Sequence, residues 1–344
     1  MSAFREMTNE LRFANTIVRR KPFQCLLQVT NRCNMKCEFC DFWPNYVSRK
    51  DELSVADYDK LSRELRDYGS LLVSIEGGEP LVREDLGDII KLFARHHLPI
   101  LFTNGWYVTD EIAKRFFNNG LHQVGVSIDF SSATKHDGFR GVAGAFDRAI
   151  SAVESFKRHA PKGGAQIHVI SVLMKDNETD IEALLQLSRS LQVGHQFTLL
   201  SNNGYRRTNR VHMPQQLSGA YLLELRKRYP HLRTFSEYFQ HIDAFLDHGA
   251  DDAVNSTLPA CKAGRQSFNV DHIGNVSACI EKIDQFVGNI KSDSIRDCLQ
   301  RLASADHSQG CQACWTLCRG MTQGFSDSGN WRSWKDLILR RHAV

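Results

Sequence analysis

Short apolar runs alternate with amphipathic stretches along the chain up to about residue 200. The apolar runs predict strands, and the stretches between them have the spacing of helices with one buried face. A strand followed by a helix, repeated along this part of the chain, predicts a parallel sheet that is either doubly wound or a partial barrel. In both folds the active site lies at the carboxyl ends of the strands. The predicted strands cover 23–30, 71–76, 100–103, 123–128, 166–173 and 196–200.

Capping residues mark the ends of several predicted helices. Ser54 can cap the amino end of the first helix after the cysteine motif, and Gly69 can stop that helix. Thr109 precedes two acidic residues at the start of a later helix, which Gly120 closes. The next two predicted helices cover 145–159 and 179–191.

The pattern changes after about residue 205, where the strand–helix repeat stops. The elements predicted there are helices over 215–229, 236–248 and 295–302, and a hairpin with strands over 267–270 and 275–279. We therefore expect an α/β chain with a small C-terminal α+β domain. The expected divisions are a barrel over 1–205, a helical connection over 206–254, the small domain over 255–330 and a tail over 331–344.

The composition describes an ordinary water-soluble protein. Hydrophobic residues make up 42% of the 344 residues and charged residues 24%, so a sizeable core is available. The net charge of +4 is too small to predict a nucleic-acid partner or a membrane surface. No apolar run is long enough for a transmembrane helix, and the N-terminus lacks a secretory pattern. We expect a cytoplasmic location, where ten reduced cysteines point to metal or redox chemistry.

The first cysteine motif, Cys33, Cys37 and Cys40, directly follows the first predicted strand. Three closely spaced thiolates can each hold one iron of a 4Fe–4S cube and leave the fourth iron without a protein ligand. Zinc would usually recruit a fourth cysteine or histidine nearby, and this segment contains no histidine. The alternatives are a zinc knuckle or three core cysteines. An iron without a protein ligand is expected to bind another molecule.

The string Cys-x3-Cys-x-Phe-Cys between a strand and a helix resembles the signature of the radical S-adenosylmethionine (SAM) superfamily. The resemblance implies an enzyme with a partial (β/α)6 TIM-like barrel. It implies that the open iron binds SAM, that an electron from the cluster breaks the C5′–S bond, and that the 5′-deoxyadenosyl radical abstracts a substrate hydrogen. Phe39 matches the family's aromatic position beside the adenine. An electron donor such as flavodoxin or ferredoxin is expected as a partner.

A glycine pair ends the second predicted strand. Gly77, Gly78 and Glu79 resemble the family's Gly-Gly-Glu motif, whose backbone and carboxylate hold the SAM amino group. Two glycines allow a close backbone approach, although such a pair is usually only a turn.

Polar residues also follow the fourth predicted strand. The resemblance implies that Ser127 and Asp129 contact the SAM carboxylate or ribose, whereas strand-end capping is the simpler interpretation. Arg140 matches an arginine that relatives use against the SAM carboxylate, and a surface arginine is its alternative. The fifth strand shows no counterpart of the family's adenine-binding motif.

Six cysteines lie after residue 255. One of them, Cys298, lies on an apolar face, as does Cys25, and both are expected in the core, which leaves five. A cysteine before a hairpin, one at its end and a distant cysteine pair can close a four-thiolate site. Zinc and iron–sulfur both satisfy such a site. The five cysteines are Cys261, Cys279, Cys311, Cys314 and Cys318.

The spacing Cys-x12-Gly-x4-Cys from Cys261 to Cys279 resembles the SPASM and Twitch domains of radical SAM enzymes, which carry auxiliary 4Fe–4S clusters. The SPASM form holds two clusters and needs more than five cysteines, so the resemblance favours the Twitch form with one. The segment from Cys314 to Cys318 is shorter than the full SPASM pattern, which leaves the ligand set open. The first choice is Cys261, Cys279, Cys311 and Cys314, with Cys318 as the spare.

The substrate and the net reaction are left open by the sequence. An auxiliary cluster could accept an electron from a product radical, or the radical could form a C–C or C–S bond in a ribosomal peptide. Only about 22 residues precede the first strand, too few for a peptide-recognition module, so a small molecule or lipid precursor is expected. The non-enzyme alternative is a structural zinc or iron–sulfur module. It would require three motif matches at three strand ends to be accidental.

Overall fold

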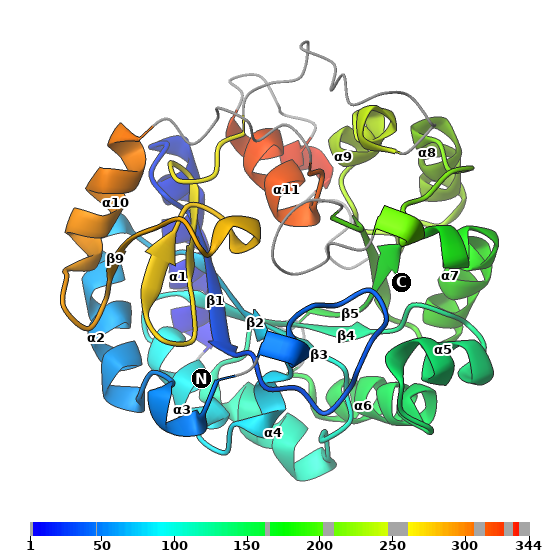
Figure 1. Ribbon diagram of the computed structural model, residues 1–344, viewed down its shortest axis with the longest axis horizontal. Coiled ribbons are helices and arrows are strands. Elements are labelled where there is room, and N and C mark those ends of the chain that lie inside the picture. The colour runs from blue at the N-terminus through cyan, green and yellow to red at the C-terminus, as the bar shows by residue number, and fades with distance from the viewer. Residues whose placement is uncertain are drawn as a thin grey trace.

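The protein is built around one curved sheet whose strands follow the order β6-β5-β4-β3-β2-β1-β7-β8-β9 (Figure 1). The computed structural model describes residues 3–45, 47–161, 166–201, 210–246, 261–305, 314–326 and 333–336. Strands β1 to β6 pair in parallel and confirm the six predicted strands, with ends shifted by at most two residues. They are β1 (Gln24–Thr30), β2 (Leu72–Gly77), β3 (Leu98–Thr103), β4 (Gln123–Ser127), β5 (Gln166–Leu173) and β6 (Gly194–Leu199).

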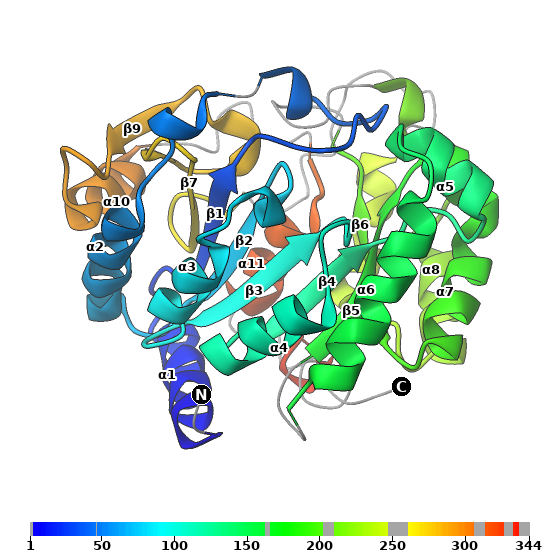
Figure 2. The same cartoon turned by 90° about the horizontal axis from the view of Figure 1, so that it is seen from below.

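Helices cover the outer face of this parallel sheet (Figures 1 and 2). Their ends follow the predicted capping residues: the Ser54 side chain accepts from Asp57 N, and Thr109 accepts from Ile112 N. Gly120 closes its helix with φ +98°, a conformation that favours glycine. The helices are α2 (Val55–Leu65), α3 (Leu86–Phe93), α4 (Asp110–Asn119), α5 (Ala133–Arg140), α6 (Ala145–His159) and α7 (Ile181–Ser190).

Alternation along the strands separates the core from the interior of the barrel. In β1, Cys25, Leu27 and Val29 face the helices and belong to the main hydrophobic core, which also contains Cys298. The intervening positions Gln24 and Leu26 line a cavity on the inner face of the sheet. The sheet therefore has one face that builds the core and one face that is available for ligands.

The C-terminal strands continue the barrel sheet. Strand β7 (Ser267–Val270) pairs in parallel with β1, and β8 (Asn275–Ser277) and β9 (Phe286–Asn289) follow in antiparallel order. The hairpin of β7 and β8 was predicted, whereas β9 was not. The division of the chain near residue 255 stays a prediction, because 247–260 lie outside the described residues.

The helices of the C-terminal half agree only partly with the prediction. Helix α8 (Gly219–Arg228) and helix α9 (Ser236–Gln240) are shorter than expected, and α10 (Ile295–Ser304) lies beside α2 (Figure 1). Helix α11 (Leu317–Ser326), which was not predicted, lies on the inner side of the sheet, where Leu317 and Met321 line the cavity. None of the described helices is long and apolar enough to cross a membrane.

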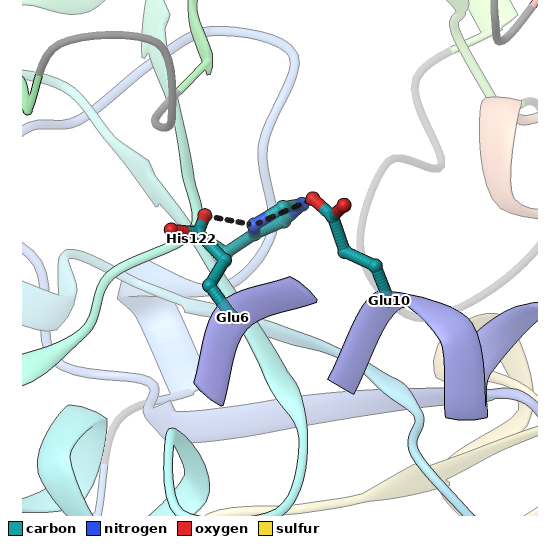
Figure 3. A group of neighbouring side chains, drawn as sticks. All are labelled: Glu6, Glu10 and His122. Atoms are coloured by element: carbon teal, nitrogen blue, oxygen red, sulfur yellow. Dashed lines mark hydrogen bonds and ion pairs between the residues drawn. The ribbon is translucent and has the colours of Figure 1, made fainter. Parts of the chain in front are cut away.

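An unpredicted helix, α1 (Ala3–Val18), lies at the amino ends of the barrel strands. Asn9 donates to Ala94 O and His97 O, at 3.3 and 3.2 Å. Glu6 and Glu10 reach from one face of α1 to His122 just before β4 (Figure 3), and Glu6 Oε1 lies 2.9 Å from His122 Nδ1. These three groups could also bracket a cation. The short contact is accounted for by a hydrogen bond between Glu6 and the buried imidazole, which fastens α1 to the barrel.

Candidate active site

One cavity of about 390 Å³ occupies the inner face of the sheet. The three cysteines of the first motif line it, as does Cys318 from the second group. The structure also brings together on its wall all the residues that the sequence assigned to SAM: Phe39, Gly77, Gly78, Glu79, Ser127, Asp129 and Arg140. Residues from five separate segments thus meet at the carboxyl ends of the strands, as predicted for a parallel α/β sheet.

The three thiols of the first motif lie in the loop after β1. Burial raises the pKa of Cys33 to about 12 and that of Cys37 to about 11, and the charges of the neighbouring cysteines add to both shifts. The charges of the three cysteines act on one another, so the thiols are near neighbours. Three such thiols can each hold one iron of a 4Fe–4S cube.

The glycine pair fastens this loop to β2. Gly78 N donates to Thr30 O at 2.8 Å, and Glu79 N donates to Arg32 O at 2.9 Å. A Cβ on Gly77, which has φ +127°, would lie 2.0 Å from Thr30 O, and one on Gly78 would lie 2.2 Å from Arg32 O. Both contacts are to backbone, so the glycines are needed for the approach of two loops as well as for any ligand.

A buried carboxylate anchors the same loop, and sequence reasoning missed it. Glu52 accepts from Arg32 Nε at 2.9 Å and Arg32 Nη2 at 3.0 Å, and its Oε2 lies 3.4 Å from Arg83 Nη1. Thr30 also donates to Glu52. Since Arg32 directly precedes Cys33, this network sets where the cysteine loop begins. Glu52 is twelve residues beyond Cys40 and lies in no motif, so the sequence gives no signal for it.

The Glu79 carboxylate already accepts several hydrogen bonds from neighbouring residues. Its Oε1 accepts from Leu81 N at 3.0 Å and Thr103 Oγ1 at 2.8 Å, and its Oε2 accepts from Asn104 N at 2.7 Å. Burial raises the pKa of Glu79 despite these donors. One acceptor position on Oε2 is left for a ligand. Asn104, which sequence reasoning also missed, donates to Asn34 Oδ1 at 2.9 Å and so joins β3 to the cysteine loop.

Arg140 is held between an acid, an aromatic ring and the cysteine loop. Its Nη2 donates to Asp129, whose other oxygen accepts from Val172 N at 2.9 Å. The guanidinium lies 5.7 Å from the centroid of the Phe39 ring, and it lowers the pKa of Cys37 against the larger effect of burial. Arg140 Nε is buried without a hydrogen-bond partner among the described residues. An anion bound here would supply that partner.

The second cysteine group also gathers, on the other side of a small apolar cluster. Burial raises the pKa of Cys279, and the charges of Cys314 and Cys318 raise it further, so both of these thiols lie near Cys279. Their segment is fixed to the barrel by Trp315, whose Nε1 donates to Tyr238 O at 2.8 Å. Cys261 is described just before β7, and Cys311 lies outside the described residues.

The two cysteine groups share a wall. Leu26, Phe42 and Ile280 form a buried apolar cluster against which Cys40 of the first group and Cys279 and Cys318 of the second group pack. Such a wall excludes water between the two thiol groups.

The residues fit the cofactors that these motifs imply. Three thiols leave one iron of a cube without a protein ligand. Beside them lie the glycine pair Gly77 and Gly78 and the Glu79 Oε2 atom, which has one acceptor position left. Arg140 Nε–H also lies there and has no hydrogen-bond partner among the described residues. An amino acid head group needs this combination of an acceptor for its ammonium and a donor for its carboxylate.

Comparison with known proteins finds a family model that matches part of this chain. Residues 27–188 match the family model described as the radical SAM superfamily. The chain is similar to Fe-coproporphyrin III synthase of Methanosarcina barkeri, with 34% identity over 161 residues, which are 46% of this chain and 39% of that protein. The matched parts span about two fifths of the first curated relatives.

Other similarities extend beyond the barrel. Mycofactocin maturase MftC of Mycobacterium tuberculosis is 28% identical over 274 residues, which cover 77% of this chain and 67% of that protein. The fold resembles that of Streptococcus suis SuiB, solved bound to the precursor peptide SuiA, with a TM-score of 0.63 and 16% identity over 89% of this chain and 71% of that chain.

The family implies a 4Fe–4S cluster and SAM, and the partial barrel, the cysteine motif and the family match agree. Residues 27–188, slightly less than half of the chain, therefore match the radical SAM superfamily.

Proposed function

We propose that this chain is an enzyme that holds a 4Fe–4S cluster through Cys33, Cys37 and Cys40 and binds SAM beside it. The observation that carries the proposal is the meeting of this thiol group and all the SAM-motif residues on one cavity wall. When bound and reduced, the cluster and SAM supply a 5′-deoxyadenosyl radical that abstracts a hydrogen atom from the substrate.

The chain's own residues position SAM in this proposal. Gly77 and Gly78 bring the backbone of β2 against the cysteine loop, and Glu79 Oε2 accepts from the SAM ammonium. Asp129 holds the Arg140 guanidinium so that Nε–H can donate to the SAM carboxylate. Ser127 lines the wall between them, and Phe39 lies against the adenine.

We also propose one auxiliary 4Fe–4S cluster in the C-terminal half. Cys279, Cys314 and Cys318 are three described thiols, of which the last two lie near the first, and the fourth ligand is Cys261 or Cys311. The first choice from the sequence kept Cys318 as the spare, and the charge of Cys318 acting on Cys279 supports including it here. In the variant lacking Cys33, Cys37 and Cys40, about four irons per chain should remain. Replacing Cys318 as well should remove them, and unchanged iron would make Cys318 the spare.

The proposed substrate is a peptide. The similarity to the maturase MftC continues into the C-terminal half, whereas the similarity to the synthase of M. barkeri is confined to 46% of the chain. The C-terminal half supplies α11 and Cys318 to the cavity wall. The longer similarity to the maturase supports a peptide as the substrate.

A small molecule or lipid precursor is the second candidate. Fe-coproporphyrin III synthase is 34% identical over 161 residues, whereas MftC is 28% identical over 274 residues. The two candidates can be separated by growing the source organism in D2O and dividing its extract into a peptide fraction and a small-molecule fraction. Deuterium in 5′-deoxyadenosine from the peptide fraction supports a peptide substrate, and deuterium from the small-molecule fraction alone contradicts it.

A further inference from the structure

Residues 231–234 extend the sheet beyond β6 and carry Arg233, a half-buried residue whose Nε and Nη1 atoms are buried. His195 N donates to His231 O at 2.9 Å, and Arg233 N donates to His195 O at 2.7 Å, in a parallel bridge. The Arg233 side chain lies over Gly194, where a Cβ would be 2.3 Å from Nε. Gly194 is the first residue of β6, so the guanidinium lines the cavity at the amino ends of the strands, away from the first cysteine group.

The charge of Arg233 is not compensated within the described part of the chain. Its Nε and Nη1 are buried there without a hydrogen-bond partner. Burial lowers the pKa of Arg233 to about 10, and no described carboxylate counteracts that shift. Three more deeply buried arginines have acidic partners, namely Arg83 with Glu52 and Asp85, Arg140 with Asp129, and Arg226 with Asp336. An unpaired cation costs stability unless an anion joins it.

Neutral hydrogen-bonding groups surround this cation. Gln123, Gln166 and Gln196 line the same cavity. His168 is buried, and burial together with Arg233 lowers its pKa to about 3, so the ring is neutral. Its Nε2 lies 3.2 Å from Gln123 Nε2, which makes that ring nitrogen an acceptor and places the proton on Nδ1. Nδ1 has no partner among the described residues.

We propose that Arg233 and the surrounding amides form a subsite that binds a carboxylate of the substrate. The proposal rests on the proposed function in one respect, that this cavity holds the substrate. A single guanidinium fork matches a carboxylate in shape and charge. A phosphate would bring a second negative charge into a cavity that Glu10 and Glu76 also line. The SAM carboxylate is assigned to the opposite end, beside Arg140, so the carboxylate at Arg233 belongs to the substrate.

The subsite can be tested by calorimetric titration of the cluster-loaded protein with matched acids and amides. One pair is propionate and propionamide, and the other is N-acetyl-Gly-Gly and its C-terminal amide. Each acid is compared with its amide in the wild type and in Arg233→Gln, Arg233→Lys and Arg63→Gln. Arg63 is an exposed arginine on α2 and serves as the matched control.

We expect at least one acid to bind the wild type about tenfold to a hundredfold more tightly than its amide. Arg233→Gln should abolish that preference, Arg233→Lys should keep part of it, and Arg63→Gln should keep all of it. A preference for N-acetyl-Gly-Gly indicates a peptide carboxyl terminus, and one confined to propionate indicates a small acid. Equal binding of acids and amides by the wild type, or a preference that survives Arg233→Gln, overturns the subsite.

Thermal unfolding without ligand provides a second readout. Removal of an uncompensated, half-buried cation should raise the midpoint of Arg233→Gln above that of the wild type. A lower midpoint would mean that Arg233 has a structural partner and would overturn the proposal. SAM cleavage by the wild type is measured in parallel. Its absence would refute the proposed function and leave the comparison of acids and amides valid.

Discussion

Replacing Glu52 by glutamine should destabilise the protein without changing the shape of the side chain. Glu52 is almost fully buried and accepts two hydrogen bonds from Arg32 and a longer one from Arg83. A hydrogen bond to a charged group contributes about 1.5–3 kcal/mol. Breaking a buried ion pair costs about 3–5 kcal/mol when the partner is left uncompensated. Here Asp85, 2.8 Å from Arg83, and solvent around the quarter-exposed Arg32 compensate in part, so we expect about 2–3 kcal/mol.

The assay is urea unfolding of the cluster-free protein, because a bound cluster would obscure a two-state analysis. Glu84→Gln is the matched control, since Glu84 pairs with Arg49 at 3.3 Å on the exposed surface and should cost less than about 1 kcal/mol. Glu52→Gln should also retain less iron after reconstitution, because Arg32 fixes the start of the cysteine loop. A loss no larger than that of Glu84→Gln would refute the view that Glu52 anchors this loop.

Two further predictions concern the backbone approach and a buried histidine. Gly78→Ala should cost about 1–3 kcal/mol of unfolding free energy and reduce bound iron, because its Cβ meets the Arg32 carbonyl. Gly138→Ala, whose Cβ meets nothing within 4 Å, should be neutral or stabilising, and equal losses in both variants would contradict the steric argument. Burial lowers the pKa of His97 from 6.5 to about 4, with smaller contributions from His96 and Arg12, and its Nδ1 accepts from Leu71 N. Between pH 6.5 and 4, His97 therefore binds a proton in the unfolded chain but not in the folded chain. The free energy of unfolding should fall by about 3 kcal/mol as the pH is lowered through this window. His97→Gln should flatten that pH dependence in urea titrations, and an unchanged slope would mean that His97 does not titrate as stated.

The sequence predicted the strands, helices and motif residues that depend on local patterns along the chain. Strand alternation and capping residues such as Ser54 and Thr109 placed the parallel sheet and its main helices. The cysteine spacing and the strand-end motifs identified the residues that line the cavity, because carboxyl ends of parallel strands meet at one edge. Helices α1 and α11 were missed. Helix α11 follows a cysteine segment without a cap signal.

Contacts between residues far apart in the chain could not be predicted from the sequence. Glu52 meets Arg32 and Arg83 only after the loop and β2 have been brought together, and no spacing rule connects them. Arg233 likewise becomes a cavity residue only because residues 231–234 align beside β6 over a glycine. The choice among the last five cysteines stays a prediction for the same reason, since spacing does not show which thiols meet.

The central claim is that Cys33, Cys37 and Cys40 hold the cluster at which SAM is cleaved. Its most direct test is the formation of 5′-deoxyadenosine from SAM by the anaerobically reconstituted protein with dithionite as the electron source. The wild type and Cys298→Ala, which alters only a core cysteine, should both form 5′-deoxyadenosine. The variant with all three cysteines replaced by alanine should form none. Continued SAM cleavage by that triple variant would contradict the account.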